Sequence, residues 1–249
     1  MGRAGNLVIK RSIDSGEMKR FSIVSVDMFG TLVDVSSRKY VIWRAFLKDR
    51  YSDELAEQYW ERATDLVFQY YDQVIQKRQY VPPKVIYEIC YSKLFLEIDL
   101  DIDPKEAARL LAHQHSFSTP YGDAMIFLDS VGKEYPICVS SDTDEDMLGP
   151  LRQLYPFDNI VTSEQLGSYK TSADKRFFSA VINHYGARPE SIIHIGDSGS
   201  DVIGASEAGI VTCWLNRKHR IWSHDVEPDY EVNSLIEVAS ILGIDIDSE

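Results

Sequence analysis

The sequence predicts an α/β fold: a doubly wound parallel sheet of Rossmann-like type that is interrupted by an all-helical domain. Two observations predict it. From residue 119 onward, short apolar runs rich in valine and isoleucine alternate with segments of helical periodicity, as in a parallel sheet with right-handed crossovers. Residues 36–118 show helical periodicity only, whereas the run at 21–26 before them has the composition of a strand.

The chain begins with a polar stretch, residues 1–20, that we expect to form a tail or an edge segment. The apolar run that follows ends at Asp27, and Phe29, Gly30 and Thr31 come soon after it. A buried parallel strand is such a run, and α/β folds bind ligands at its carboxyl end. Gly30 permits a tight turn that would bring the Thr31 hydroxyl back toward the Asp27 carboxylate, although an aspartate at this place can also simply begin a loop.

A long helix is predicted after Ser52, whose side chain can serve as its N-cap. Apolar side chains recur every three or four residues along it, which indicates one buried face. They are Leu55, Tyr59, Ala63, Leu66, Tyr70 and Val74, widened by Trp60, Val67 and Tyr71. Aromatic residues at this spacing are far more often part of a core than contacts to a cofactor.

Two more helix starts follow within the same block. Pro83 comes after a proline pair that ends the first helix, and Asp103 precedes a proline and a glutamate placed as in a capping box. The helix that begins there runs to about His115. We therefore expect residues 36–118 to form a helical cap domain.

The core domain is expected to comprise residues 21–35 and 119–249. Beyond the cap its expected strands are 136–140, 159–162, 191–196, 210–214 and, at an edge, 230–232. The expected helices are 124–133, one through Leu148, Leu151 and Leu154, then 172–185, 200–208 and 235–242. Strands that alternate with helices in this way place every strand in parallel.

Polar residues of matching chemistry follow four of the strands. They are Asp27 with Thr31, Ser140 with Ser141, Lys170 beyond the third strand, and Asp197 with Asp201. The carboxyl ends of parallel strands share one edge, so these side chains can meet there. A carboxylate that attacks an anionic phosphoryl group needs a cation, for which Mg²⁺ held by carboxylates is the usual solution, and donors for the phosphoryl oxygens. Each residue alone is more often structural, and the order and spacing of all four groups carry the prediction.

In that order and spacing the four groups resemble the motifs of the haloacid dehalogenase superfamily of hydrolases, over about residues 21–214. The resemblance implies a catalytic core with a helical cap. It also implies the role of each residue. Asp27 is the nucleophile, Thr31, Ser140, Ser141 and Lys170 bind the phosphoryl group, and Asp27, Asp197 and the Phe29 backbone carbonyl bind Mg²⁺ with Asp201 in support.

The first motif departs from the family's phosphatases, which usually carry a general acid two residues after the nucleophile. Phe29 stands there, as an aromatic residue does in the family's metal-free dehalogenases, but those enzymes usually lack the acid that this chain keeps as Asp197. Three interpretations follow. The first is a Mg²⁺-dependent phosphoryl hydrolase, the second is a metal-free 2-haloacid dehalogenase-like hydrolase, and the third is a non-catalytic binding or regulatory protein. If an acid replaces the missing one, Asp142 and Asp144 are the nearest candidates.

The composition narrows the range of partners. The formal charge is 26 − 39 = −13, and no basic run is present, which argues against a nucleic-acid partner. No apolar run approaches the roughly 18 residues of a membrane span. The three cysteines are scattered in apolar stretches and indicate buried thiols in a reducing, cytoplasmic compartment. We expect a small-molecule substrate, and no pattern specifies an oligomeric state.

Overall fold

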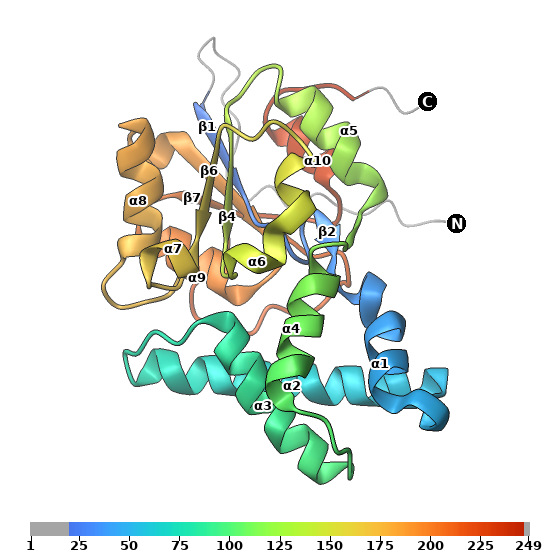
Figure 1. The fold of residues 1–249 in the computed structure, drawn as a ribbon. Coiled ribbons are helices and arrows are strands. Elements are labelled where there is room, and N and C mark those ends of the chain that lie inside the picture. The colour runs from blue at the N-terminus through green and yellow to red at the C-terminus, as the bar shows by residue number, and fades with distance from the viewer. Residues whose placement is uncertain (1–19, 247–249) are drawn as a thin grey trace.

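The structure is a computed structural model that describes residues 20–246, so the tail predicted for residues 1–20 lies outside the described residues except for Arg20. Six strands form one parallel sheet in the order β5-β4-β1-β6-β7-β8 (Figure 1). They are β1 (Ile23–Val26), β4 (Ile137–Ser141), β5 (Asn159–Thr162), β6 (Ile192–Gly196), β7 (Val211–Leu215) and β8 (Tyr230–Val232). The predicted α/β fold with a parallel sheet is confirmed.

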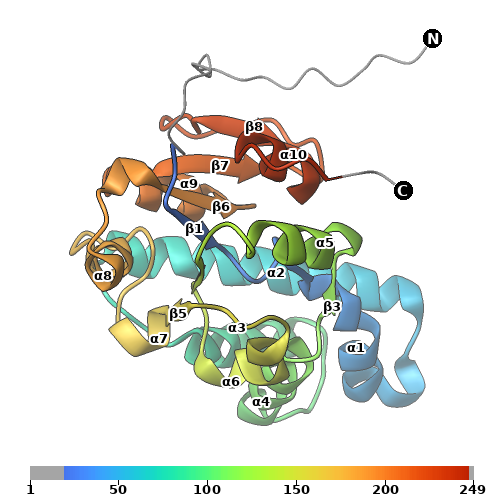
Figure 2. The same cartoon turned by 90° about the horizontal axis from the view of Figure 1, so that it is seen from above.

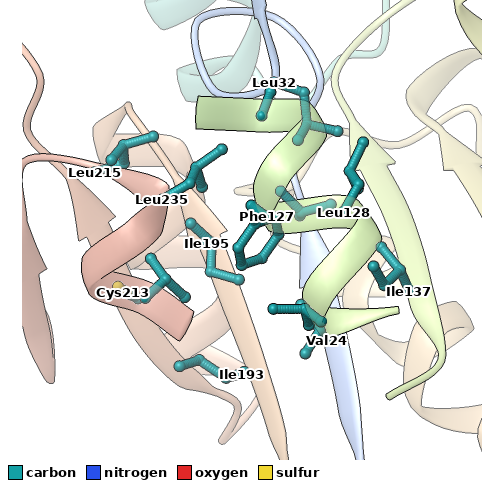
Figure 3. Packing of buried hydrophobic residues seen from close by; sticks show 14 of the residues in the cluster. Val24, Leu32, Phe127, Leu128, Ile137, Ile193, Ile195, Cys213, Leu215 and Leu235 are labelled. Carbon is teal, nitrogen blue, oxygen red and sulfur yellow. The ribbon is translucent and has the colours of Figure 1, made fainter. Parts of the chain in front are cut away.

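Helices cover both faces of this sheet. The helices of the core are α5 (Gly122–Val131), α6 (Glu145–Leu148), α7 (Ser163–Leu166), α8 (Arg176–Tyr185), α9 (Gly199–Glu207) and α10 (Leu235–Ile241), with 3₁₀ turns η3 (Gly149–Gln153) and η4 (Pro189–Ser191). On one face, Phe127 of α5 and Leu235 of α10 pack against β1, β4, β6 and β7 (Figure 3). On the other face, Phe178 of α8 and Ala205 of α9 pack against Ile192. Because both faces are buried, the strands have continuous apolar sequences.

The segment between β2 (Val33–Asp34) and β3 (Thr119–Pro120) contains helices only. Its elements are η1 (Val35–Arg38), α1 (Lys39–Leu47), η2 (Lys48–Arg50), α2 (Asp53–Gln76), α3 (Pro83–Glu97) and α4 (Pro104–His115). The Ser52 hydroxyl accepts from the Leu55 amide at 3.2 Å, as predicted, and so fixes the start of α2. These helices bury their own apolar cluster, and α2 passes behind the strands when the molecule is viewed from the sheet side (Figure 2).

A two-stranded antiparallel ladder joins the cap to the core, and the sequence did not predict it. Val33 pairs with Pro120 and Asp34 pairs with Thr119, so the chain leaves the core and returns to it through one narrow connection. The Ser37 hydroxyl strengthens this connection by accepting from the Thr119 amide at 3.0 Å. The ladder holds both cap entrances together directly after the Asp27 loop.

Local backbone effects explain two of three differences from the predicted helices. α6 ends at Leu148, because Gly149 has a φ of +37° and Pro150 has no amide hydrogen, so the helix expected through Leu154 is replaced by a 3₁₀ turn. α8 begins at Arg176 rather than at residue 172, because Lys175 before it has a φ of +53°. The short helix α7 was not predicted.

Candidate active site

A cavity of about 840 Å³ lies between the carboxyl edge of the sheet and the cap. Six of the residues predicted for the site line it from the core side, namely Asp27, Phe29, Ser141, Lys170, Asp197 and Asp201. They come from four separate segments: the loop after β1, the end of β4, the loop after α7, and the β6–α9 turn. The parallel sheet therefore brings together side chains that are far apart in the sequence.

Lys170 is the centre of this group. Its Nζ donates to Asp27 Oδ1 at 2.7 Å and to Asp201 Oδ1 at 2.5 Å, and all three side chains are almost fully buried. Burial lowers the pKa of Lys170, but the carboxylates of Asp201, Asp27 and Asp142 outweigh this effect and raise it above its usual value. Lys170 is therefore an ammonium ion that holds the strand-end carboxylates in place.

The position of Asp201 is fixed from three sides. Burial raises its pKa, but Lys170 and His194 outweigh that effect and hold the pKa below its usual range. The Nε2 atom of His194 lies 2.9 Å from Asp201 Oδ1, and because an ionised carboxylate only accepts, Nε2 carries the proton. Asp201 Oδ2 accepts from the Ser198 amide at 3.0 Å. With its oxygens engaged in this way, Asp201 is suited to support a site rather than to occupy its centre.

Two glycines allow the carboxylates to approach one another. Gly30 has a φ of +85°, and a Cβ atom there would lie 2.7 Å from Asp197 Oδ1. A Cβ atom on Gly196 would lie 2.0 Å from Asp201 Cγ. Any larger residue would displace the side chain of Asp197 or Asp201, so these glycines shape the site.

The three carboxylates form a group that fits a hard cation. One oxygen each of Asp27, Asp197 and Asp201 lies within 4.8 Å of the others. Burial, followed by the charges of Asp201 and Asp27, raises the pKa of Asp197 to about 7. Burial also raises the pKa of Asp27, while Lys170 opposes that effect. Such crowding disfavours full ionisation and is relieved by a cation with oxygen ligands, such as Mg²⁺.

The structure corrects the placement of one predicted residue. The Ser140 side chain is fully buried, does not line the cavity and is hydrogen-bonded to the Ser25 hydroxyl at 2.8 Å. Ser141 lines the cavity instead, and its hydroxyl is close enough to Asp27 to lower the pKa of that carboxyl. The hydroxyl that β4 offers to a ligand is therefore that of Ser141. Neighbouring residues on a strand point in opposite directions, so an error of one residue exchanges a core position for a site position.

Thr31 does not make the contact that the sequence predicted, and Phe29 lies next to the cap domain. The Thr31 hydroxyl is buried and has no hydrogen-bond partner among the described residues, so it does not bond to Asp27. Phe29 lines the cavity, and its ring centroid lies 6.0 Å from that of His115 in the cap. The position where related phosphatases carry an acid thus contacts the cap domain.

The two candidates for a substitute acid differ in location. Asp142 lines the cavity, accepts from the Lys170 amide at 3.1 Å, and has a pKa that burial raises to about 7. Asp144 does not line it; its carboxylate accepts from the Lys84 amide in the first turn of α3. Asp142 is therefore placed for chemistry, whereas Asp144 fastens the core to the cap.

Sequence reasoning missed the cap wall of the cavity. Trp60, Val67 and Tyr71, which were interpreted as core residues, line the cavity, as do Tyr87 and His115. The helical periodicity of α2 is the same for residues that face the cap core and for residues at the edge of that face, so it could not separate them. The loop after β7 adds Arg220 and His224, which no motif had indicated.

With this geometry in place, the class of the protein is defined. The chain belongs to the haloacid dehalogenase-like hydrolase family, because the family model described as "Hydrolase: haloacid dehalogenase-like hydrolase" matches residues 21–209. The protein is thus a hydrolase of the haloacid dehalogenase superfamily, as its four motifs indicated. Within the described residues 20–246, no helix is long and apolar enough to cross a membrane.

One curated protein and two solved structures illustrate what this chain is similar to. Pyrimidine 5′-nucleotidase YjjG of Escherichia coli (strain K12) is 35% identical over 88 residues, which are 34% of this chain and 38% of that relative's length. The HAD-hydrolase YfnB of Bacillus subtilis, bound to magnesium, has a TM-score of 0.78 at 18% identity and covers 91% of this chain and 100% of its own. The L-2-haloacid dehalogenase of Xanthobacter autotrophicus, with chloropropionic acid covalently bound, has a TM-score of 0.77 at 18% identity over 90% and 98%. At these identities the structural likeness shows the fold alone.

Proposed function

We propose that this hydrolase is a Mg²⁺-dependent phosphoryl hydrolase that acts on a small phosphate compound through an aspartyl-phosphate on Asp27. The observation that carries the proposal is the placement of Asp197 beside Asp27, with an oxygen of each within 4.8 Å of one of Asp201. A carboxylate nucleophile alone would suit several reactions. A second carboxylate beside it, whose cationic partner, Arg220, lies 3.5 Å from Asp197 Oδ2 and does not prevent burial and the neighbouring carboxylates from raising the pKa of Asp197, suits a site that holds a cation.

Asp27, Asp197 and the Phe29 backbone carbonyl would hold Mg²⁺, and Asp201 would support them. When bound, the ion would supply positive charge against the phosphoryl oxygens and favour the ionised form of both carboxylates. Asp27 attacks phosphorus, the bond from phosphorus to the leaving oxygen breaks, and water then hydrolyses the acyl phosphate. Lys170 keeps the Asp27 carboxylate oriented at 2.7 Å and, with Ser141, donates to the phosphoryl oxygens.

Protonation of the leaving group falls to Asp142 in this proposal. It is the carboxyl group of the β4 loop that lines the cavity, and burial raises its pKa to about 7, a value suited to general acid–base catalysis near neutral pH. Acyl phosphates do not need such an acid, because their leaving groups depart as anions. Substrates of this second kind would compensate for the absence of an acid at Phe29.

The relatives support the proposal from two directions. YjjG is a nucleotidase, which is a phosphate-releasing enzyme, and it is the curated relative with 35% identity over 88 residues. YfnB, whose fold is similar, was solved with magnesium bound. The three free cysteines, all buried, are consistent with the proposed cytoplasmic location.

One observation favours a second candidate, a dehalogenase-like hydrolase in which Asp27 attacks carbon. Phe29 puts an aromatic ring in the cavity, which resembles the metal-free dehalogenases of the superfamily. The X. autotrophicus enzyme, which has a similar fold, was solved with chloropropionic acid covalently bound. In this alternative Asp197 would have no metal ion to bind, which is why we rank it second.

A hydrolysis screen with acetyl phosphate, phenyl phosphate and L-2-chloropropionate, each with Mg²⁺ and with a chelator, tests the proposal. We expect phosphate release from the first two that needs Mg²⁺, and no chloride release. Chloride release that persists in the chelator, without phosphate release, would establish the second candidate instead. No turnover of any compound would favour a non-catalytic protein.

A further inference from the structure

The cap half of the cavity differs chemically from the core half. Its wall is mostly apolar and aromatic, and includes Trp60, Val67, Phe68, Tyr71, Tyr87 and Tyr91. Of the described cap residues that line the cavity, none is lysine or arginine, and the one charged residue is Asp72. Such a wall attracts an uncharged, flat group and does not attract a second phosphate.

His115 is the exception in this wall. It lies at the end of α4, is 2% exposed and lines the cavity. Neither of its ring nitrogens has a hydrogen-bond partner among the described residues. Its neighbours are the rings of Phe29, Trp60 and Tyr87, with centroids 6.0, 6.1 and 6.1 Å away. Buried polar groups in folded proteins nearly always have partners, so two open nitrogens beside a cavity indicate a partner that comes from outside the chain.

His194 shows what a purely structural histidine in this fold looks like. It is equally buried, but its Nδ1 lies 2.8 Å from the Ser25 hydroxyl and its Nε2 lies 2.9 Å from Asp201. Both nitrogens are therefore satisfied within the core. His115 has the same burial without either contact.

We propose that His115 is a specificity-determining residue that forms a hydrogen bond with an uncharged polar group on the part of the substrate that leaves, while the flat portion of that group packs against Trp60 and Tyr87. This inference rests on the proposed function and adds to it the chemical class of the leaving group. Burial lowers the pKa of His115 to about 3, so its imidazole is neutral at pH 7 and offers one donor and one acceptor. A carbonyl, an amide or a ring nitrogen can use either.

Matched aryl phosphates can test this. The substrates are phenyl phosphate and its 2-, 3- and 4-carbamoyl derivatives, and acetyl phosphate reports separately on the proposed function. The proteins are the parent, His115→Leu, His115→Asn and His113→Leu, the last being the same change on an exposed residue of the same helix. Because the leaving-group chemistry is identical for parent and variant, the change in kcat/KM relative to phenyl phosphate isolates the contact.

For His115→Leu we expect kcat/KM on the best carbamoyl ester to fall by about three- to tenfold relative to phenyl phosphate, the usual effect of one neutral hydrogen bond. His115→Asn should retain part of the preference, and His113→Leu all of it. The melting temperature of His115→Leu should equal or exceed that of the parent, because the substitution removes unpaired buried polar atoms.

Three results would overturn the inference. One is an unchanged preference in His115→Leu. Another is a uniform loss on every ester together with a lower melting temperature, which would mark a structural residue. The third is hydrolysis of acetyl phosphate but of no aryl ester. A parent that hydrolyses none of these phosphates would instead remove the proposed function, and this inference with it.

Discussion

The two walls of the cavity are built in opposite ways. On the core wall the charged side chains hold one another: Lys170 bonds to both Asp27 and Asp201, and Asp142 accepts from the Lys170 backbone. On the cap wall aromatic rings dominate, and His115 has no partner within the described residues. The difference indicates that the two walls have different functions. In our proposal the core wall positions the reacting groups before a ligand binds, whereas the cap wall forms its contacts with the part of the substrate that leaves.

Substitution of the proposed nucleophile, Asp27, should have the largest effect on the core wall. Asp27→Asn should lower turnover of acetyl phosphate by a factor of at least about 10³, because the amide cannot form the covalent intermediate. Lys170 would keep its contact with Asp201, so the melting temperature should change little. Steady-state kinetics and thermal unfolding measure both, with Asp129→Asn on the exposed face of α5 as the control. Normal turnover in Asp27→Asn would leave the mechanism without its nucleophile.

The pairing of the core wall can be tested through stability. Lys170→Met leaves two buried carboxylates without their cation and should reduce the free energy of unfolding by about 3–5 kcal/mol. Lys175→Met is the matched control, because Lys175 is about half exposed and 3.8 Å from Glu207, and should change it by at most about 1 kcal/mol. Urea unfolding without metal gives both values. Equal effects of the two substitutions would show that the Lys170 cluster is not held by charge.

Phe29 lies where the two walls meet, so a carboxylate at this position would extend the charged core wall toward the cap. Phe29→Asp should raise hydrolysis of an alkyl phosphate by up to about 10²-fold, because it adds to Asp142 a second acid at the position where the family's phosphatases usually carry one, and should change acetyl phosphate turnover little. Phe29→Leu keeps the apolar character without the acid and is the control. Stability must be measured in parallel, because the substitution buries a charge. If Phe29→Asp folds but hydrolyses no alkyl phosphate faster than the parent, an acid at this position does not protonate the leaving group.

A pH dependence of stability is also expected on the core wall. Burial raises the pKa of Asp142 from 3.8 to about 7, so the folded protein binds this proton more tightly than the unfolded chain. The stability that this group contributes is fully present below about pH 4 and is lost as the pH rises toward 7. In Asp142→Asn the stability should therefore decline less between pH 4 and pH 8. Urea unfolding midpoints of chelator-treated protein over this pH range measure the difference. If the urea midpoint depends on pH in the same way in both proteins, Asp142 is not the group that binds this proton.

Much of the core could be predicted from the sequence because its signals are local. Continuous apolar runs that end in Asp27 or Asp197 reveal buried parallel strands and the edge where their ends meet. Ser140 and Ser141 could not be told apart, because orientation at a strand end depends on a register of one residue. The cap wall could not be predicted either, since helical periodicity does not distinguish a residue such as Trp60 at a cavity from one inside a core. The sequence around His115 gave no signal, because its proposed role depends on the absence of hydrogen-bond partners around its ring in the part of the folded chain that the structure describes.

The central claim is that Asp27 and Asp197 together hold Mg²⁺, and calorimetric titration of the ion tests it without relying on turnover. The parent should bind one Mg²⁺, and Asp197→Asn should weaken that affinity by at least about tenfold, because it removes one of two charged ligands. Asp72→Asn, on the cap wall, should bind the ion as the parent does. Equal affinity in the parent and Asp197→Asn, or no binding to the parent, would contradict the account.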